Sequence, residues 1–293
     1  MLGQQLLNGV VLGAVYALFA LGFTLIFGVL GVINLTYGFY FSAGAFLALY
    51  FTQGLGISMM LALLLAGIVT GGIAVILDGL LLTPLRRAKA PELASLMVTL
   101  GATLFLYSLM SAYFGTDIRR LPPKVFTNVG FNWLGLHIET SQLLILVTMV
   151  VIVSGLGWLT QRTRMGLAIR ALAENGTAAQ LAGINAGAVT RIVSFLSGGI
   201  GGLAGVLIGM NYNAIEPYMG EQMMLKGFAV VIMGGLGNIR GALVAGLMLG
   251  VLETLTAGYI GSSLKDAVGF GLAVLTLWVR PVGLFGRATI KRA

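Results

Sequence analysis

Apolar runs of membrane-crossing length recur along the whole 293-residue chain. A helix needs about 20 apolar residues to cross the hydrocarbon core of a bilayer. Only 9% of the residues are charged, whereas a soluble domain carries roughly a quarter. The sequence therefore predicts an all-α, polytopic transmembrane helix bundle, a single domain over residues 1–293, with about eight or nine spans. We expect these spans at about residues 6–32, 36–54, 57–82, 93–114, 142–160, 192–213, 224–239, 241–260 and 264–281.

The composition excludes several classes of function. There is no cysteine, and His137 has no second histidine with which to complete a metal site, so we expect no metal ligands. No lysine follows a glycine, so the sequence lacks the phosphate-binding loop of P-loop ATPases. The net charge of +8 resides in a few hydrophilic loops, where basic residues set membrane topology. We therefore predict no catalytic residues, no cofactor and no nucleic-acid partner.

Three basic clusters predict the orientation in the membrane: the Arg86, Arg87 and Lys89 group, the segment 161–191, and the group of Arg280, Arg287, Lys291 and Arg292. Cytoplasmic loops carry an excess of lysine and arginine, so all three clusters are expected in the cytoplasm. The loop 115–141, with its Pro122–Pro123 pair, then faces outside, where it either closes over the outer mouth or serves as a connector. The side of the N-terminus stays open, because 36–54 is either a span or a re-entrant segment.

Charged residues inside predicted spans are costly and mark candidate functional positions. Asp78 lies eight residues before Arg86, so we predict a local ion pair. Glu253 is the most deeply placed carboxylate; it either lines a path or pairs with a buried partner, and we favour pairing. Lys226 and Glu221 lie near an outer boundary, from which long side chains can reach water.

Two segments far apart in the chain share a pattern of glycines. Residues 27–34 read FGVLGVIN and residues 233–240 read MGGLGNIR. Glycine destabilises a continuous helix by about 1 kcal/mol per position. Transporters built from repeats often place such broken helices at the substrate path. The alternative is a chance similarity between two glycine-rich membrane helices.

The segment 161–191 is a polar island in the apolar sequence. Thr163–Ala173 favours a helix, Asn175–Gly176 breaks it, and Thr177 is predicted to cap a second short helix, Ala178–Ala182. Small side chains on such a helix allow a protein partner to approach closely. From composition alone, the island is either an ordinary connector or a docking site.

Several motifs resemble one transporter family. Ala178-Ala179-x3-Gly183, with Val193 further on, resembles the E-A-A-x3-G-x9-I signature of ABC importer permeases, although Thr177 replaces its glutamate. Met165-Gly166-x3-Arg170-Ala171-x-Ala173-Glu174 resembles the branched-chain amino-acid ABC transporter permease family, specifically the smaller of its two membrane subunits. The resemblance covers almost the whole chain, including Asn8-Gly9-x3-Gly13, Gly28-x2-Gly31-x-Ile33-Asn34, Lys226-Gly227-Phe228, Gly234-Gly235-Leu236-Gly237 and Arg280-Pro281-x-Gly283-Leu284-Phe285-Gly286.

This resemblance implies a permease domain of an ATP-driven importer for branched-chain or related hydrophobic amino acids, in the bacterial cytoplasmic (inner) membrane. The implied partners are membrane lipid, a second similar permease, two ATP-binding cassette ATPases and a periplasmic or lipid-anchored substrate-binding protein. Hydrolysis belongs to the ATPases, so the chain itself is not an enzyme. The residues expected to couple to the ATPases are Arg170, Glu174, Ala178, Ala179 and Gly183. Those expected along the translocation path are Asn34, Tyr37, Gly234, Gly235 and Gly237.

One departure from the family pattern leaves the cargo open. After Asn34 the family usually has a small residue, a histidine and a glycine, whereas this chain has Leu35-Thr36-Tyr37-Gly38. Urea, amides or other small organic solutes are therefore alternative cargoes within the family. Two alternatives outside it are a secondary transporter driven by an ion gradient and a passive channel.

Overall fold

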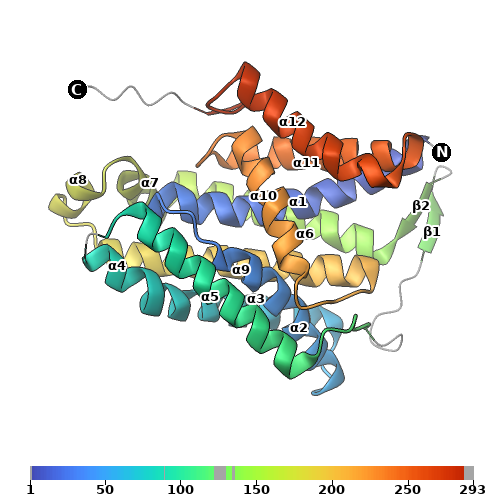
Figure 1. Ribbon diagram of the computed structural model, residues 1–293, viewed down its shortest axis with the longest axis horizontal. Helices are drawn as coiled ribbons and strands as arrows, with labels where there is room; N and C mark the ends of the chain where they lie inside the picture. The colour runs from blue at the N-terminus through green and yellow to red at the C-terminus, as the bar shows by residue number, and fades with distance from the viewer. Residues whose placement is uncertain (1, 89, 122–129, 134–135, 287–293) are drawn as a thin grey trace.

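The computed structural model describes residues 2–88, 90–121, 130–133 and 136–286. Among them are long helices, a few short helical turns and one antiparallel hairpin (Figure 1). The elements are α1 (Leu2–Leu30), α2 (Thr36–Gln53), α3 (Met59–Leu77), the π-helical turn η1 (Asp78–Leu82), α4 (Thr83–Arg87), α5 (Glu92–Phe114), β1 (Gly130–Trp133), β2 (Leu136–Glu139), α6 (Thr140–Arg162), α7 (Arg164–Glu174), α8 (Gly176–Leu181), α9 (Ala186–Tyr212), α10 (Met219–Gly234), α11 (Ile239–Tyr259), the 3₁₀ turn η2 (Ser262–Leu264) and α12 (Lys265–Val279).

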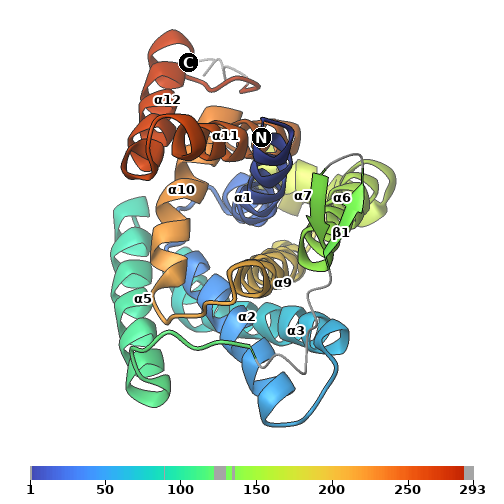
Figure 2. The same cartoon turned by 90° about the vertical axis from the view of Figure 1, so that its right-hand side faces the viewer.

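The described residues contain seven helices long and apolar enough to span a membrane. They are Leu2–Leu30, Met59–Arg87, Glu92–Phe114, Thr140–Arg162, Ala186–Tyr212, Ile239–Tyr259 and Ser262–Val279. The all-α membrane architecture agrees with the sequence-based prediction. The expected count of about eight or nine spans depends in addition on α2 and α10. α10 has 16 residues and lies steeply tilted across the bundle, between α5 and α1 (Figure 2).

Helix α1 is the central element of the bundle, with α9, α11 and α6 around it (Figure 2). Its residues from Ala14 to Leu21 are at most 4% exposed. Small residues allow α11 to approach it closely: a Cβ on Gly13 would lie 2.8 Å from the Cα of Leu247, and one on Gly246 would lie 2.6 Å from the Ala17 nitrogen. Close backbone approach through glycine and alanine is the usual basis of helix packing in lipid, where water provides no hydrophobic drive.

Helix α9 packs in the same way on α1, α2 and α3. Gly205 lies against the backbone of Phe41, and Gly202 lies against the side chain of Thr70. Between α9 and α1, the Ser197 hydroxyl donates a 2.7 Å hydrogen bond to the Gly22 carbonyl. Glycines thus bring three long helices against the core of the bundle.

The long axis of the molecule separates two chemically different ends (Figure 1). At one end lie α4 with Arg86, helices α7 and α8, and the segment after α12; we call this the basic end. At the other end, the hairpin end, the start of α1 meets β2, where Gln4 Nε2 donates a 2.9 Å hydrogen bond to the His137 carbonyl. The described members of the three basic clusters therefore share one end, as predicted. Outside the described residues are Lys89, Pro122, Pro123, Arg287, Lys291 and Arg292.

The first two helices run in opposite directions along the bundle. α1 starts at the hairpin end and finishes at the basic end, and the chain turns back over residues 31–35. α2 then runs toward the hairpin end, where Gln53 Nε2 donates a 3.1 Å hydrogen bond to the Arg120 carbonyl. If the basic end is cytoplasmic, the start of α1 faces outside.

Candidate docking arm and transport cavities

Helices α7 and α8 form an arm that projects from the basic end (Figure 1). The Thr163 hydroxyl caps α7 by accepting a 3.0 Å hydrogen bond from the Gly166 nitrogen. Asn175 breaks the helix as predicted and caps α8, because its Oδ1 accepts a 3.0 Å hydrogen bond from the Ala178 nitrogen. The predicted cap at Thr177 was wrong: α8 begins at Gly176, two residues before the predicted start at Ala178, since the Asn175 side chain already fills the capping role.

The arm is fastened to the bundle through one face of α7. Gly166 and Ile169 are buried there, and a side chain at Gly166 would collide with the backbone of Leu159 and Thr160. Ile169 is 4% exposed. This close packing holds α7 against the end of α6.

The predicted coupling residues lie on both sides of this arm. Arg170, Glu174, Ala178 and Gly183 are exposed, whereas Ala179 is buried at 4%. Gly183 has a φ of +85°, a left-handed conformation that closes α8 and that glycine adopts without steric cost. Four of these five positions are therefore accessible to a partner at the basic end.

Two leucines on the arm were missed by sequence reasoning. Leu181 is 86% exposed and Leu167 is 61% exposed, at the end of the molecule that carries its basic residues. An apolar side chain held at an aqueous end of a membrane protein is typical of a protein interaction site. Leucines are abundant throughout this chain, so only the placement of α8 distinguishes Leu181.

A cavity of about 620 Å³ opens at the basic end beside the arm. Its lining includes Thr24, Gly28, Arg170, Gly237, Arg240 and Phe285. Arg170, a predicted coupling residue, therefore shares a cavity with Gly237, a predicted path residue. Gly234 and Gly235 instead make backbone contacts, the first with Gly241 and the second with Gly286.

The two glycine-patterned segments meet at this cavity. A Cβ on Gly28 would lie 3.3 Å from the Cα of Gly237. At equivalent positions of the shared pattern, Gly31 and Gly237 have φ values of +64° and +80°. The first segment follows the end of α1 and the second follows the end of α10. Gly31 directly follows α1, whereas α10 already ends at Gly234 with Gly235 as its C-cap, so the two segments share positive-φ glycines but not the same helix boundary.

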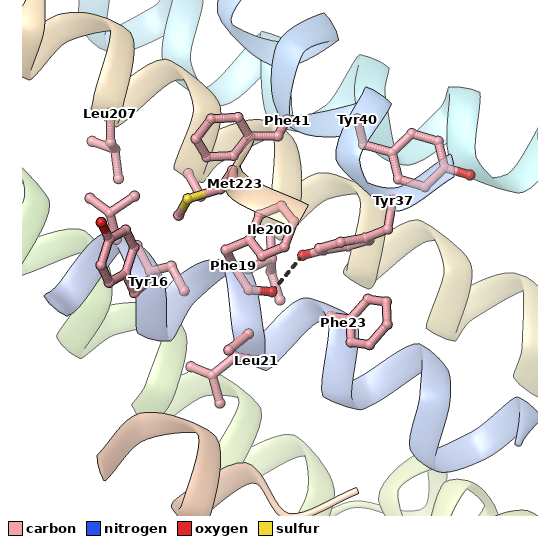
Figure 3. Packing of buried hydrophobic residues seen from close by; sticks show 14 of the residues in the cluster. Tyr16, Phe19, Leu21, Phe23, Tyr37, Tyr40, Phe41, Ile200, Leu207 and Met223 are labelled. Atoms are coloured by element: carbon pink, nitrogen blue, oxygen red, sulfur yellow. Dashed lines mark hydrogen bonds between the residues drawn. The ribbon is translucent and has the colours of Figure 1, made fainter. Parts of the chain in front are cut away.

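Asn34 and Tyr37 are enclosed by protein in this conformation. Asn34 is 1% exposed, and its Oδ1 accepts a 3.0 Å hydrogen bond from the Thr36 nitrogen at the start of α2. Tyr37 is fully buried, and its hydroxyl donates a 3.0 Å hydrogen bond to the Phe19 carbonyl (Figure 3). Its ring packs edge-on against Phe19 and Phe23, with ring centroids 4.7 and 5.6 Å away. These aromatic rings fill the middle of the bundle.

Two adjoining cavities open toward the hairpin end. The first, about 470 Å³, is the glutamate cavity, with a lining that includes Gln5, Asn8, Gln142, Asn211, Thr254 and Glu253. The second, about 290 Å³, is the lysine cavity, with a lining that includes Leu12, Phe41, Ile208, Met219, Met223 and Lys226. Tyr16 and Tyr212 belong to both linings. Along α1, these two cavities reach Tyr16 and the basic-end cavity begins at Thr24, and the residues between them from Ala17 to Leu21 are fully buried.

A network of charged side chains connects four helices beside these cavities. Lys226 on α10 lies 2.9 Å from Glu253 on α11 and 2.9 Å from Asp266 on α12. Tyr16 on α1 donates a 2.6 Å hydrogen bond to the same Glu253 oxygen. Glu253 therefore has the buried partner that we favoured, and it also lines the glutamate cavity. The side chain of Lys226, 17% exposed, points toward these acids, whereas Glu221 is exposed.

The local ion pair predicted for Asp78 is confirmed. Arg86 Nη2 lies 2.7 Å from Asp78 Oδ2, and Arg86 Nη1 donates a second hydrogen bond of 3.0 Å to Asp78 Oδ1. Asp78 is 3% exposed. Such a two-pronged arginine–carboxylate pair is strong and directional, and here it holds η1 against α4.

Several known transport permeases are similar to this chain. Residues 5–277 match the family described as "Branched-chain amino acid transport system / permease component". The high-affinity branched-chain amino acid transport system permease protein BraD of Pseudomonas aeruginosa is 33% identical, over 99% of this chain and 97% of the relative. LivH of Escherichia coli K12, of the same description, is 32% identical over the same shares. A probable branched-chain amino acid transport permease of Methanocaldococcus jannaschii is 31% identical, over 97% of this chain and 93% of the relative.

No solved structure matches the chain significantly. The curated relatives extend over nearly its full length, from the start of α1 to the end of the bundle. Their names describe membrane transport subunits, in agreement with the apolar helices described above. The chain therefore belongs to the branched-chain amino acid transport permease family and is a transport subunit rather than an enzyme.

Proposed function

We propose that this chain is a permease subunit of an ATP-driven importer for branched-chain or related hydrophobic amino acids in the bacterial cytoplasmic membrane. The observation that carries this proposal is the α7–α8 arm, which presents Leu181 at 86% exposure at the basic end. The sequence has no phosphate-binding loop, so in this proposal ATP is bound and hydrolysed by a partner. In this proposal, two ATPases dock on the arms of two paired permeases, and a binding protein delivers cargo at the hairpin end.

The contacts of the arm suggest how ATP is coupled to transport. Closure of the ATPases moves α8, and the buried face of α7, at Gly166 and Ile169, passes that motion to the bundle. Arg170 lies on the exposed side of α7 and lines the basic-end cavity opposite Gly237. A small rotation of α7 therefore changes the width of this cavity, where the two glycine-patterned segments meet.

Two classes of cargo are compatible with membership of this family: branched-chain amino acids, and small solutes such as urea and amides. Tyr37 replaces the usual histidine, which favours a different solute if this position touches the path. Its side chain is fully buried among aromatic rings, and this favours a packing role instead. Branched-chain amino acids therefore remain the proposed cargo, with urea and amides as the alternative.

Reconstitution tests the proposal directly. Vesicles containing this chain, its paired permease and both ATPases should take up leucine only when ATP and the binding protein are present on the appropriate sides. Uptake by the permease alone under an ion gradient would instead identify a secondary transporter. Flux that ignores both ATP and the binding protein would identify a channel. Urea in place of leucine tests the alternative cargo in the same vesicles.

A further inference from the structure

The charged network at the hairpin end has a feature that a purely structural ion pair does not need. Its carboxylate and its ammonium group line different cavities: Glu253 lines the glutamate cavity, and Lys226 lines the lysine cavity. Tyr16, which binds both groups, lies between them and lines both cavities. Each charge is therefore paired with the other and at the same time borders space that a ligand can occupy.

Burial of this pair is costly, which calls for a reason beyond packing. Glu253 is 2% exposed and lies in an apolar helix, where an ionised side chain is unfavourable. Replacing buried ion pairs by apolar residues is often neutral or stabilising, so such a pair is weak evidence of a stabilising role. Intramembrane charges of this kind commonly mark substrate pathways.

The network contains charges of both signs. Lys226 faces two acids, Glu253 and Asp266, and a second ammonium group, Lys265, lines both cavities. Two further carboxylates border the space, Glu139 in the glutamate cavity and Glu216 in the lysine cavity. A ligand with one charge of each sign can exchange partners with this network without leaving an unpaired charge, whereas an ion with a single charge cannot.

The surroundings of the two charges differ in polarity. The lysine cavity has apolar walls, formed by Leu12, Phe41, Ile208, Met219 and Met223. The glutamate cavity is lined by amides and hydroxyls, including Gln5, Asn8, Gln142 and Asn211. An aliphatic side chain fits the first environment, and an ammonium group fits the second. Their combined dimensions are in the range of small-molecule sites in proteins.

We propose that Lys226, Glu253 and Tyr16 form a binding site for a zwitterionic aliphatic amino acid, in which Lys226 binds the α-carboxylate and Glu253 binds the α-ammonium group. The ion pair between them is the empty state of the site, and a ligand replaces it by two new pairs of the same kind. This inference rests on the proposed function for its cargo. The inference adds a site at which the permease itself binds both charged groups of the amino acid.

Equilibrium binding to the assembled importer in nanodiscs, without binding protein or nucleotide, tests the site. The probe is radiolabelled leucine, competed by 3-methylbutylamine, which lacks the carboxylate, and by 4-methylpentanoate, which lacks the ammonium group. The wild-type complex should prefer leucine over each competitor by roughly 10- to 100-fold, the value of one charged hydrogen-bonded contact.

The two variants should lose this preference in a crossed pattern. Lys226→Met should bind leucine and 3-methylbutylamine about equally, yet still reject 4-methylpentanoate. Glu253→Gln should show the reverse. Lys226→Arg keeps the positive charge and should keep the preference over 3-methylbutylamine. If the Lys226–Glu253 pair only stabilises the fold, the effect of each variant should not depend on whether the competitor lacks the carboxylate or the ammonium group.

A second ion pair in the same chain supplies the matched control. Asp78→Asn breaks the Asp78–Arg86 pair at the basic end and should leave the discrimination between the three compounds unchanged. The site is overturned if wild type binds no leucine, if the Lys226 and Glu253 variants discriminate like wild type, or if they lose all three ligands equally.

Measurements of leucine uptake in vesicles distinguish a failure of this binding site from a failure of the proposed importer function. If wild type takes up leucine with ATP but the crossed pattern is missing, the site is wrong and the importer assignment stands. If the crossed pattern appears but uptake is independent of ATP, the importer assignment is wrong and the site stands.

Discussion

Replacement of Leu181 by alanine is the sharpest test of the docking arm. The side chain is 86% exposed at the tip of α8, so nearly all of its apolar surface is available to a partner. Leu→Ala removes about three carbon atoms, each worth about 0.8 kcal/mol when buried. Allowing for the fraction already covered, ATPase docking should lose about 2 kcal/mol, or roughly 30-fold in Kd. The permease itself should keep its stability to within about 0.5 kcal/mol, because the residue makes few contacts within the chain.

Binding of the ATPase to nanodisc-embedded permease measures this difference. Leu104→Ala on α5 is the matched control, since Leu104 is 58% exposed on a predicted span and should affect the Kd little. Melting temperatures of both variants should match wild type. A Kd for Leu181→Ala within twofold of wild type, with the permease intact, refutes the assignment of α8 as the docking surface.

Three further tests address coupling, packing and the translocation path. Gly183→Leu puts a non-glycine residue at a φ of +85° and destabilises the end of α8 by roughly 1–2 kcal/mol. It should uncouple ATPase activity from uptake. Normal uptake and normal substrate-stimulated ATPase activity would contradict the coupling role. Gly250→Val places a side chain against the backbone of Gly13 and should lower the melting temperature. Its control is Gly72→Val, which has open space around it and should leave the melting temperature unchanged. Equal melting temperatures of the two variants would count against the packing of α1 on α11. Tyr37→Phe removes one buried hydrogen bond, worth about 1 kcal/mol, and should leave the leucine-to-urea uptake ratio unchanged; a changed ratio would place Tyr37 on the path.

Features that depend on neighbouring residues along the chain were accessible from the sequence. The Asp78–Arg86 pair lies within one helical stretch, so a spacing of eight residues was enough to find it. The break at Asn175 was likewise local, because asparagine competes for the backbone hydrogen bonds of the next helix. The cap assigned to Thr177 was displaced for the same local reason, since Asn175 and Thr177 lie two residues apart and both can cap the same helix start.

The candidate sites were harder to predict, because they depend on which helix faces meet. Lys226 and Glu253 are 27 residues apart, and Tyr16 is 237 residues from Glu253, so nothing in their local sequence identifies them as partners. Arg170 and Gly237 were expected in different roles, and only the fold places them around one cavity. Tyr37, expected along the path, lies instead among aromatic rings that only the packing of α1 against α2 brings together.

By itself, the sequence determined the class of this protein, the approximate limits of most of its helices and the three basic clusters that share one end. Backbone polar groups in lipid must be satisfied within each helix, so hydropathy alone reports the spans, and an excess of basic residues collects on one side. The tertiary structure decided which helices meet and which side chains face the cavities. Glycine positions such as Gly13 permit close approach with almost no preference for a partner, so the pairing of α1 with α11 is selected only when the whole bundle packs.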